Sequence, residues 1–135
     1  MKEYIHKVQY YETDKMGITH HSNYIRWMEE ARVAFMADIG YDYAVLEEMG
    51  IVSPVMSVTC NYKKPTTFRD DISINVTVKE YKGVKLHLEY EMKNESGEIV
   101  CRAASSHAFL NRDGRPINMK KEYPELDSVM RDLVS

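Results

Sequence analysis

Apolar residues recur three and four positions apart between residues 24 and 35, and this spacing places them on one face of an α-helix. The apolar members of this face are Tyr24, Trp27, Met28, Ala31, Ala34 and Phe35. Ser22 or Asn23 can cap the start of the helix, and Gly40 can end it in a left-handed conformation. The pattern predicts a long helix over residues 25–39.

From residue 51 onward the hydrophobic period changes to two, which is typical of strands that bury one face. Turn residues at positions 82–83 and 94–97 separate the alternating runs. The strands that this alternation predicts cover residues 52–62, 72–78, 84–93 and 99–110, and a less regular pattern predicts a first strand within residues 3–12.

Two shorter helical patterns complete the chain. Asp42 can cap a helix over residues 43–49 that ends at Gly50, and residues 122–133 carry apolar side chains at helical spacing. A run of strands after one long helix indicates an antiparallel sheet with the helix packed on one face, an α+β fold. Because the sequence contains no repeat, linker or composition break, we expect a single domain over residues 1–135.

The composition narrows the class of protein. The chain is 44% hydrophobic and 29% charged, with a formal net charge of −3, so it lacks the basic surplus expected of a nucleic-acid-binding protein. No apolar run approaches the roughly 18 residues of a membrane span, and the first six residues lack the apolar region of a signal peptide. Cys60 and Cys101, each within a predicted strand, are interpreted as buried thiols in a reducing compartment. These features predict a cytoplasmic protein.

The candidate chemistry lies in residues 10–24, between the first predicted strand and the long helix. An acidic, glycine-containing loop there places Asp14 seven residues before His21, at the mouth of the helix. Backbone N–H groups in a first helical turn have no partner inside the helix and carry the positive end of its dipole. A carboxylate facing such donors suggests chemistry on a polarised carbonyl group.

The loop at residues 11–18, the His-Ser-Asn-Tyr run at residues 21–24, and a helix containing Trp27, Glu30 and Arg32 resemble the hotdog-fold acyl-CoA thioesterases. The branch that they resemble is the 4-hydroxybenzoyl-CoA thioesterase-like group. Its signature is an acid–x–Asp–x–x–Gly–hydrophobic loop, then an aromatic or His residue, then Asn-Tyr opening the central helix. The resemblance covers nearly the whole chain in the order of elements.

The resemblance implies a hotdog fold, in which a five-stranded antiparallel sheet wraps around the long helix. It also implies a homodimer or homotetramer with active sites at the dimer interface. By position in the motif, Asp14 corresponds to the catalytic aspartate, and His21 carries the backbone N–H that polarises the thioester carbonyl. The chain departs from the family pattern at Glu12, where Asp is common, and at His20, where an aromatic residue is usual. Both departures leave the acyl preference open.

Alternative interpretations exist for the reactive residues. Considered alone, Asp14 is interpreted as a turn-forming aspartate. Because Gly17, His21 and Asn23 accompany it in the motif, we favour a catalytic role for Asp14. The adjacent histidines could ligate zinc together with an acidic residue, but no third converging ligand is evident, so no metal site is predicted.

A second hotdog subgroup places its catalytic carboxylate on the central helix, where Glu29 and Glu30 are the candidates. Glu30 is interpreted instead as a structural residue that pairs with Arg26, four positions earlier.

Coenzyme A carries a pyrophosphate and a ribose phosphate, so cations are expected at the entrance of its site. Together with the motif residues Gly17 and Asn23, the candidate substrate-binding residues are Lys63, Lys64, Arg69 and Arg112, with Arg115 in the same turn as Arg112.

The predicted function is hydrolysis of an acyl-CoA thioester to a free acid and CoA, with no cofactor. Asp14 would act as general base or as nucleophile, and the helix N-terminus at His21 would bind the oxyanion. The alternatives are an acyl carrier protein thioesterase, a non-catalytic acyl-CoA-binding module and a hotdog hydratase. The acyl chain, the thiol carrier and the choice between dimer and tetramer stay open.

Overall fold

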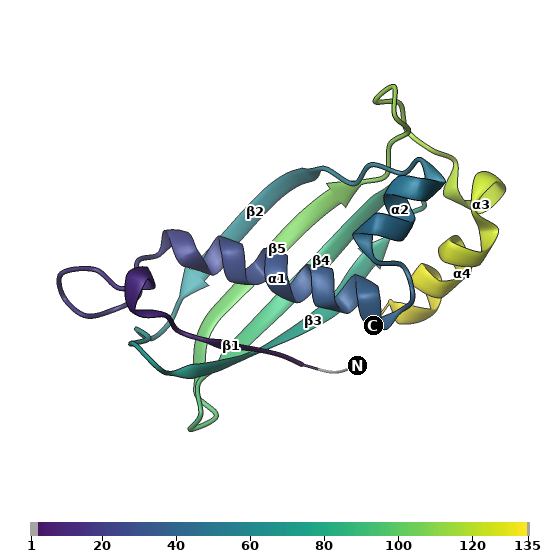
Figure 1. Cartoon of the computed structure of the whole chain (residues 1–135). Helices are drawn as coiled ribbons and strands as arrows, with labels where there is room; N and C mark the ends of the chain where they lie inside the picture. The colour runs from purple at the N-terminus through teal and green to yellow at the C-terminus, as the bar shows by residue number, and fades with distance from the viewer. Residues whose placement is uncertain (1–2, 135) are drawn as a thin grey trace.

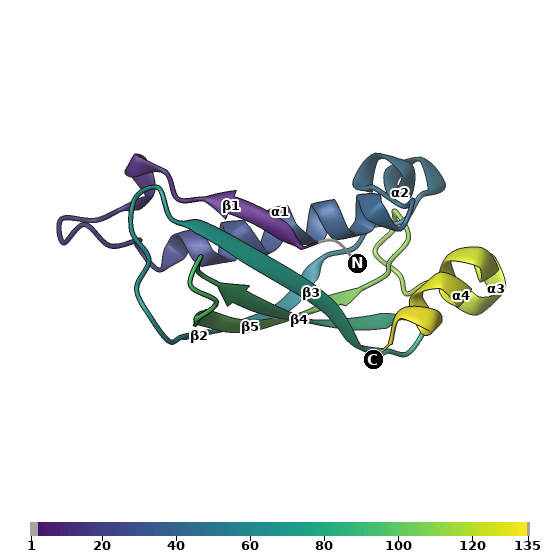
Figure 2. The ribbon, with the colours of Figure 1, turned by 90° about the horizontal axis from the view of Figure 1, so that it is seen from below.

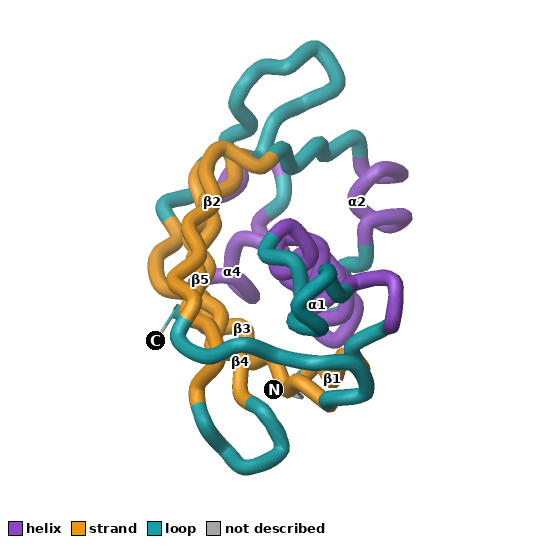
Figure 3. The backbone as a smooth tube through the Cα atoms, turned by 90° about the vertical axis from the view of Figure 1, so that its left-hand side faces the viewer, coloured by secondary structure: helices purple, strands orange, loops and turns teal. Residues whose placement is uncertain are grey.

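The structure of the protein is a computed structural model that describes residues 3–134. Its five strands form one antiparallel sheet that curls around helix α1 (Figures 1 and 3). The strands, in the spatial order β1-β3-β4-β5-β2, are β1 (Tyr4–Lys7), β3 (Asp71–Tyr81), β4 (Lys85–Lys93), β5 (Ile99–Ala108) and β2 (Val55–Tyr62). The helices are α1 (Ser22–Asp38), α2 (Tyr43–Met49), α3 (Met119–Glu122) and α4 (Pro124–Leu133), with a 3₁₀ turn η1 (Tyr10–Glu12).

The layer arrangement confirms the predicted α+β class and the five-stranded antiparallel sheet around a long helix. Helix α1 lies along one face of the sheet, and α2, α3 and α4 gather near its C-terminal end (Figures 1 and 2). None of the helices within residues 3–134 is both long and apolar enough to cross a membrane. Met1 and Lys2, which belong to the segment examined for a signal peptide, and Ser135 at the predicted domain end lie outside the described residues.

Helices and strands whose ends are set by residues close in sequence lie where the sequence predicts them. Helix α2 has the predicted bounds, because the Asp42 carboxylate accepts the Val45 N–H at 2.9 Å and Gly50 adopts a φ of 81°. Helix α1 likewise ends before Gly40, whose φ is 88°. The strands β3, β4 and β5 run through the predicted segments, with shifts of one to three residues at their ends.

The extents of the elements differ from the predictions at both ends of the chain and at the start of α1. The first strand is only four residues long, because the chain turns at residues 10–12 instead of staying extended. Helix α1 begins at Ser22, three residues earlier than predicted, so Ser22 and Asn23 lie inside the helix and do not cap it. The helix predicted over residues 122–133 is α4, with Pro124 at its first position, and the short helix α3, which was not predicted, comes before it.

The core lies between α1 and the concave face of the sheet. Trp27, Met28 and Phe35 of α1 are buried there with the inward-facing residues of the central strands, among them Ile72, Ile74, Leu88 and Met92. The alternation predicted for β4 is confirmed, since every second residue is buried from Leu86 to Met92. Cys101 is a buried free thiol, and Cys60 is a half-buried one that lies 3.6 Å from the sulfur of Met28.

A chain of polar side chains crosses this core. The guanidinium of Arg32 on α1 donates to the hydroxyls of Tyr43 (3.0 Å) and Tyr90 (3.4 Å). The Tyr90 hydroxyl lies 2.7 Å from the Ser105 hydroxyl, which in turn lies 2.7 Å from Nε2 of His107. The Nδ1 atom of His107 is buried and has no hydrogen-bond partner among residues 3–134. Burial, together with the charges of Arg32 and His87, lowers the pKa of His107 to about 4.

His107 should make the stability of the fold depend on pH. Its pKa is 6.5 when unperturbed and about 4 in the folded chain, so between these values the unfolded state binds more protons. Stability should therefore be fully present above pH 6.5 and fall by about 3 kcal/mol as the pH drops to 4. Urea unfolding at several pH values tests this. A His107→Gln variant should lose this component, whereas the exposed His87→Gln should keep most of it. An identical pH dependence in wild type and His107→Gln would contradict the assignment.

Candidate active site

The loop before α1 is a tight turn that holds Asp14 at its base. The Asp14 N–H donates to the Ile18 carbonyl at 2.9 Å, and Thr13 and Thr19 form an antiparallel bridge around it. Gly17, with a φ of 80°, allows the chain to reverse. One carboxylate oxygen of Asp14, Oδ1, accepts the Met16 N–H at 2.8 Å. Asp14 is thus a turn-forming residue, as the alternative interpretation held, but its side chain stays exposed to solvent.

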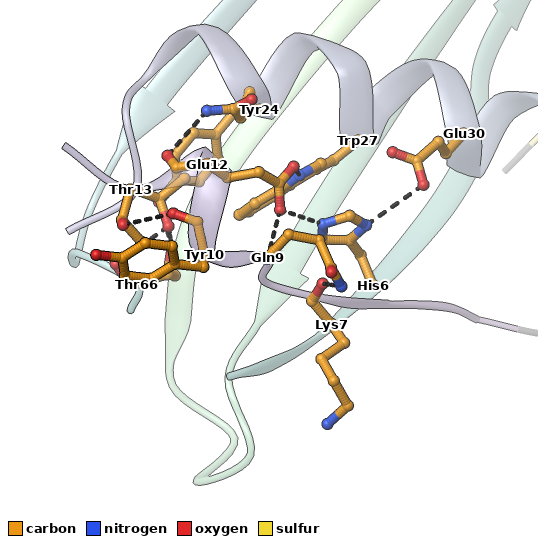
Figure 4. Close-up of polar contacts among 12 residues, drawn as sticks. His6, Lys7, Gln9, Tyr10, Glu12, Thr13, Tyr24, Trp27, Glu30 and Thr66 are labelled. Atoms are coloured by element: carbon orange, nitrogen blue, oxygen red, sulfur yellow. Dashed lines mark hydrogen bonds and ion pairs between the residues drawn. The ribbon is translucent and has the colours of Figure 1, made fainter. Parts of the chain in front are cut away.

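The segment leading into this loop is anchored by the buried carboxylate of Glu12 (Figure 4). One oxygen accepts from the Gln9 N–H at 2.8 Å and lies 2.8 Å from Nε2 of His6, and the other accepts from Nε1 of Trp27 at 2.8 Å. Burial by itself raises the pKa of Glu12, but the hydrogen bonds from Gln9, His6 and Trp27 outweigh it and lower that pKa. The carboxylate therefore ties the loop entrance to both β1 and α1.

Glu30, one helical turn after Trp27, extends this cluster. Its carboxylate accepts from the Tyr4 hydroxyl at 2.7 Å. It also lies 3.3 Å from Nδ1 of His6 (Figure 4). The expected ion pair between Glu30 and Arg26 is not formed among the described residues, because Glu30 faces β1. Its predicted structural role is nevertheless consistent with these contacts, and with Glu29 it lies on a surface separate from Asp14.

The backbone of the first turn of α1 is almost fully hydrogen-bonded. The Ser22 N–H donates to Nδ1 of His20 at 3.2 Å, the Asn23 N–H to the carbonyl of His20 at 3.1 Å, and the Tyr24 N–H to the carbonyl of His21 at 3.2 Å. The His20 ring thus occupies the capping position expected for the Ser22 or Asn23 side chain. Within residues 3–134, the N–H of His21 has no acceptor. It is the free donor at this helix end.

Asp14 and His21 meet at a surface pocket of about 350 Å³. It lies at the N-terminal end of α1, where the loop, the helix start and the end of β2 come together (Figure 1). The residues that line the pocket are Asp14, Ile18, Thr19, His20, His21, Tyr24, Tyr62, Lys63, Lys64 and Pro65. The structure therefore brings together four of the predicted site residues, namely Asp14, His21, Lys63 and Lys64.

Hydroxyl groups hold the walls of this pocket. The Thr66 hydroxyl donates to that of Thr19 at 2.6 Å and lies 3.0 Å from the hydroxyl of Tyr24, which joins the loop, the helix and the segment after β2. The Tyr62 hydroxyl donates to the His21 carbonyl at 3.3 Å. Lys64 is paired with Glu98, whereas no partner of the exposed Lys63 ammonium group is found within the described residues.

The other predicted site residues lie outside the pocket lining. Gly17 is at the tip of the loop, and Asn23 is buried behind the pocket. Arg69 is exposed, with its guanidinium 5.2 Å from the ring of Phe68. Arg112 donates to the Glu47 carbonyl near the end of α2, and α2 lies at the C-terminal end of α1 (Figure 1). Arg115 is in the same distant turn.

Sequence reasoning missed two residues of this region. For Glu12 the sequence shows only a departure from the family motif, because its burial depends on the folded positions of His6 and Trp27. For Tyr62 the sequence predicts only a place at the end of the strand over residues 52–62. It is the last residue of β2, on the same face as Cys60, and this period-two position brings it into the pocket. No group of three or more His, Cys, Asp or Glu side chains arranged to hold a metal ion occurs within residues 3–134.

Comparisons with known proteins identify relatives of the whole chain. The profile of a family described as the thioesterase-like superfamily matches residues 8–132. A Bacillus subtilis protein provisionally named acyl-CoA thioesterase YneP is 36% identical over 120 residues, which are 88% of this chain and 87% of that protein. The crystal structure of a DHNA-CoA thioesterase from Staphylococcus aureus superposes with a TM-score of 0.91 at 30% identity, covering 96% of this chain and 88% of that one. A gentisyl-coenzyme A thioesterase gives a TM-score of 0.81 at 25% identity, covering 91% and 99%.

Glu12→Gln should destabilise the protein by about 2–4 kcal/mol, because the amide cannot accept from all three donors and leaves a buried group unpaired. Since the folded pKa of Glu12 is lowered, this advantage of the wild type should be present above the unfolded pKa of the carboxyl and disappear as the pH falls through the folded pKa. Urea unfolding of both proteins measures the difference. The exposed Glu48→Gln is the matched control, and equal stability of Glu12→Gln and wild type would show that the cluster is not stabilising.

Proposed function

The chain belongs to the thioesterase-like superfamily and has its hotdog fold, and we propose that it hydrolyses acyl-CoA thioesters with Asp14 and the N–H of His21 as the reacting groups. The observation that carries the proposal is that both line one pocket, where an exposed carboxylate lies with a backbone donor that has no acceptor within the described part of the chain. The names of the relatives support a thioesterase activity and the CoA carrier.

The N–H of His21 is suited to bind a developing oxyanion. It lies at the N-terminus of a 17-residue helix, where the helix dipole is positive. The neighbouring N–H groups of the first turn are already donating, so a thioester oxygen that enters the pocket finds this donor available. Loss of one such donor typically lowers the rate about 10²–10³-fold.

Asp14 is positioned to supply the chemical step. Its Oδ1 is held by the Met16 N–H, which fixes the carboxylate, while the residue stays exposed at the pocket. As a general base, it takes a proton from water as the water oxygen bonds to the carbonyl carbon. The tetrahedral oxyanion then collapses, the C–S bond breaks, and the proton passes from Asp14 to the CoA thiolate. As a nucleophile, Asp14 would bond to the carbonyl carbon itself, the C–S bond would break, and CoA would leave as the thiolate. Water would then cleave the resulting anhydride, which gives the free acid, the Asp14 carboxylate and a proton that the thiolate takes up.

The cations beside the pocket are proposed to hold the phosphates of CoA. Lys63 and Lys64 follow the last residue of β2 and line the same pocket as Asp14. Because Lys64 is paired with Glu98, Lys63 is the more available of the two. Arg69 and Arg112 are not included in this proposal, since neither lines the pocket.

We further propose a homo-oligomer, located in the cytoplasm. Strand β2 forms one edge of the sheet, and Val55, Met56 and Tyr62 on it are each between 46% and 62% exposed. A long edge strand with exposed apolar side chains favours pairing with a second chain. Because the pocket lies at the end of β2, a partner paired there would add side chains to the site. The proposed reaction uses water, Asp14 and a backbone donor, and requires no cofactor.

Asp14→Asn should lower kcat about 10²–10⁴-fold, because the amide can neither accept a proton nor attack the carbonyl. Thiol release from a panel of acyl-CoAs, benzoyl through palmitoyl, measures this, with CoA binding by calorimetry as the check that the site is intact. Asp113→Asn, an exposed aspartate in a distant turn, is the control. If the wild type cleaves none of the esters but binds one of them, the protein is a sensor and Asp14 has no catalytic role.

Lys63→Ala should raise KM for acyl-CoA about two- to five-fold with little change in kcat, since an exposed charge pair contributes up to about 1 kcal/mol. The effect should shrink at high salt. Arg112→Ala serves as the matched cation control. Steady-state kinetics at two ionic strengths measure KM and kcat for each variant. An equal effect of both substitutions would remove Lys63 from the proposed phosphate site.

A further inference from the structure

We propose that the Asn23 side chain is a positioning residue that aims the N–H of His21 at the thioester carbonyl, an inference that rests on the proposed function. Asn23 was expected to bind substrate, but it is buried and does not line the pocket. Its amide instead holds the backbone that leads into the helix. The inference assigns it an effect on the oxyanion donor without any contact with substrate.

The link between Asn23 and the donor is the planar peptide group that joins His20 to His21. In a trans peptide the C=O of one residue and the N–H of the next lie in one plane and point in opposite directions. The described chain contains no cis peptide bond. Whatever fixes the direction of the His20 carbonyl therefore fixes the direction of the His21 N–H.

The His20 carbonyl is held by two donors from a single residue. The Asn23 backbone N–H and the Asn23 side-chain Nδ2 both donate to it, each at 3.1 Å. Nδ2 also donates to the carbonyl of Glu12 at 3.0 Å, and that carbonyl accepts the His20 N–H at 2.8 Å. Both partners of Nδ2 are pure acceptors, so the amide nitrogen, not the amide oxygen, faces them.

These bonds hold the peptide from both sides. The His20 N–H points to Glu12, whose own carboxylate is fixed by His6, Gln9 and Trp27. The His20 C=O points along α1 toward Asn23, so the His21 N–H points the opposite way, out of the helix end. The Asn23 amide is the bridge that joins the two carbonyls. Without it, the Glu12 and His20 carbonyls are no longer connected through a side chain.

The test is Asn23→Ala, with Asn23→Asp as a second variant in which a carboxylate oxygen would face two carbonyl oxygens. In Asn23→Ala each carbonyl keeps one backbone donor, so the fold is retained. We expect kcat to fall about 10- to 100-fold, while KM and the Kd for CoA itself change less than two-fold. Asn23→Asp should lose more activity than Asn23→Ala. Asn118→Ala, which removes the capping side chain of α3 far from the pocket, should leave kcat unchanged.

A crystal structure of Asn23→Ala provides a readout that does not need activity. The expected result is a rotated His20–His21 peptide, with the His20 carbonyl turned away from the Asn23 position. An unrotated peptide or an unchanged kcat would overturn the proposal. So would loss of CoA binding in parallel with kcat, because Asn23 would then only support the fold. If the wild type cleaves no acyl-CoA, the proposed function fails, while the orientation of this peptide in the variant still decides the role of Asn23.

Discussion

A buried carboxylate must be surrounded by donors, and at Glu12 this requirement organises the end of the molecule that carries the pocket. The three groups on its carboxylate come from β1, from the turn after it and from the centre of α1. None of these segments could move relative to the others without leaving a charge buried and unpaired, which costs several kcal/mol. The same residue's carbonyl accepts from His20 and Asn23. The side chain and the backbone carbonyl of Glu12 thus hold the loop, the start of α1 and the sheet in fixed positions relative to one another.

The features predictable from sequence are those whose cause lies within a few residues. The Asp42 cap and Gly50 end of α2 are local, and so is the alternation of Leu86, Leu88 and Tyr90 in β4. The start of α1 has a different kind of cause. Its first turn extends back to Ser22 because the ring and carbonyl of His20 accept its N–H groups, and His20 is in turn held by Glu12. Rules that predict helix starts from Ser, Asn or Asp side chains do not consider a cap supplied by a histidine.

In the candidate site, too, only the features with a local cause could be predicted from the sequence. Asp14 and His21 belong to one motif, in which they stand seven positions apart, and both line the same pocket. Lys63 reaches the same pocket from the end of β2, which sequence order alone does not reveal but which the pairing of β2 with β5 enforces. Arg112 carries the same charge, yet it sits in a turn beside α2. Charge type can be read from a sequence, whereas the distance between two loops depends on the register of the sheet between them.

A backbone N–H donor does not depend on which side chain the residue at its position carries. The N–H of His21 would be present with nearly any residue there, so the side chains at positions 21 and 62 around the pocket can change in evolution without removing the donor. Under the proposed mechanism, what must be inherited instead is the scaffold that orients one peptide group, which consists of the buried polar residues Glu12 and Asn23. Under the proposed mechanism, the residues that set the acyl preference are different from the residues that maintain the reaction. Lineages can therefore exchange substrates while the chemistry stays fixed.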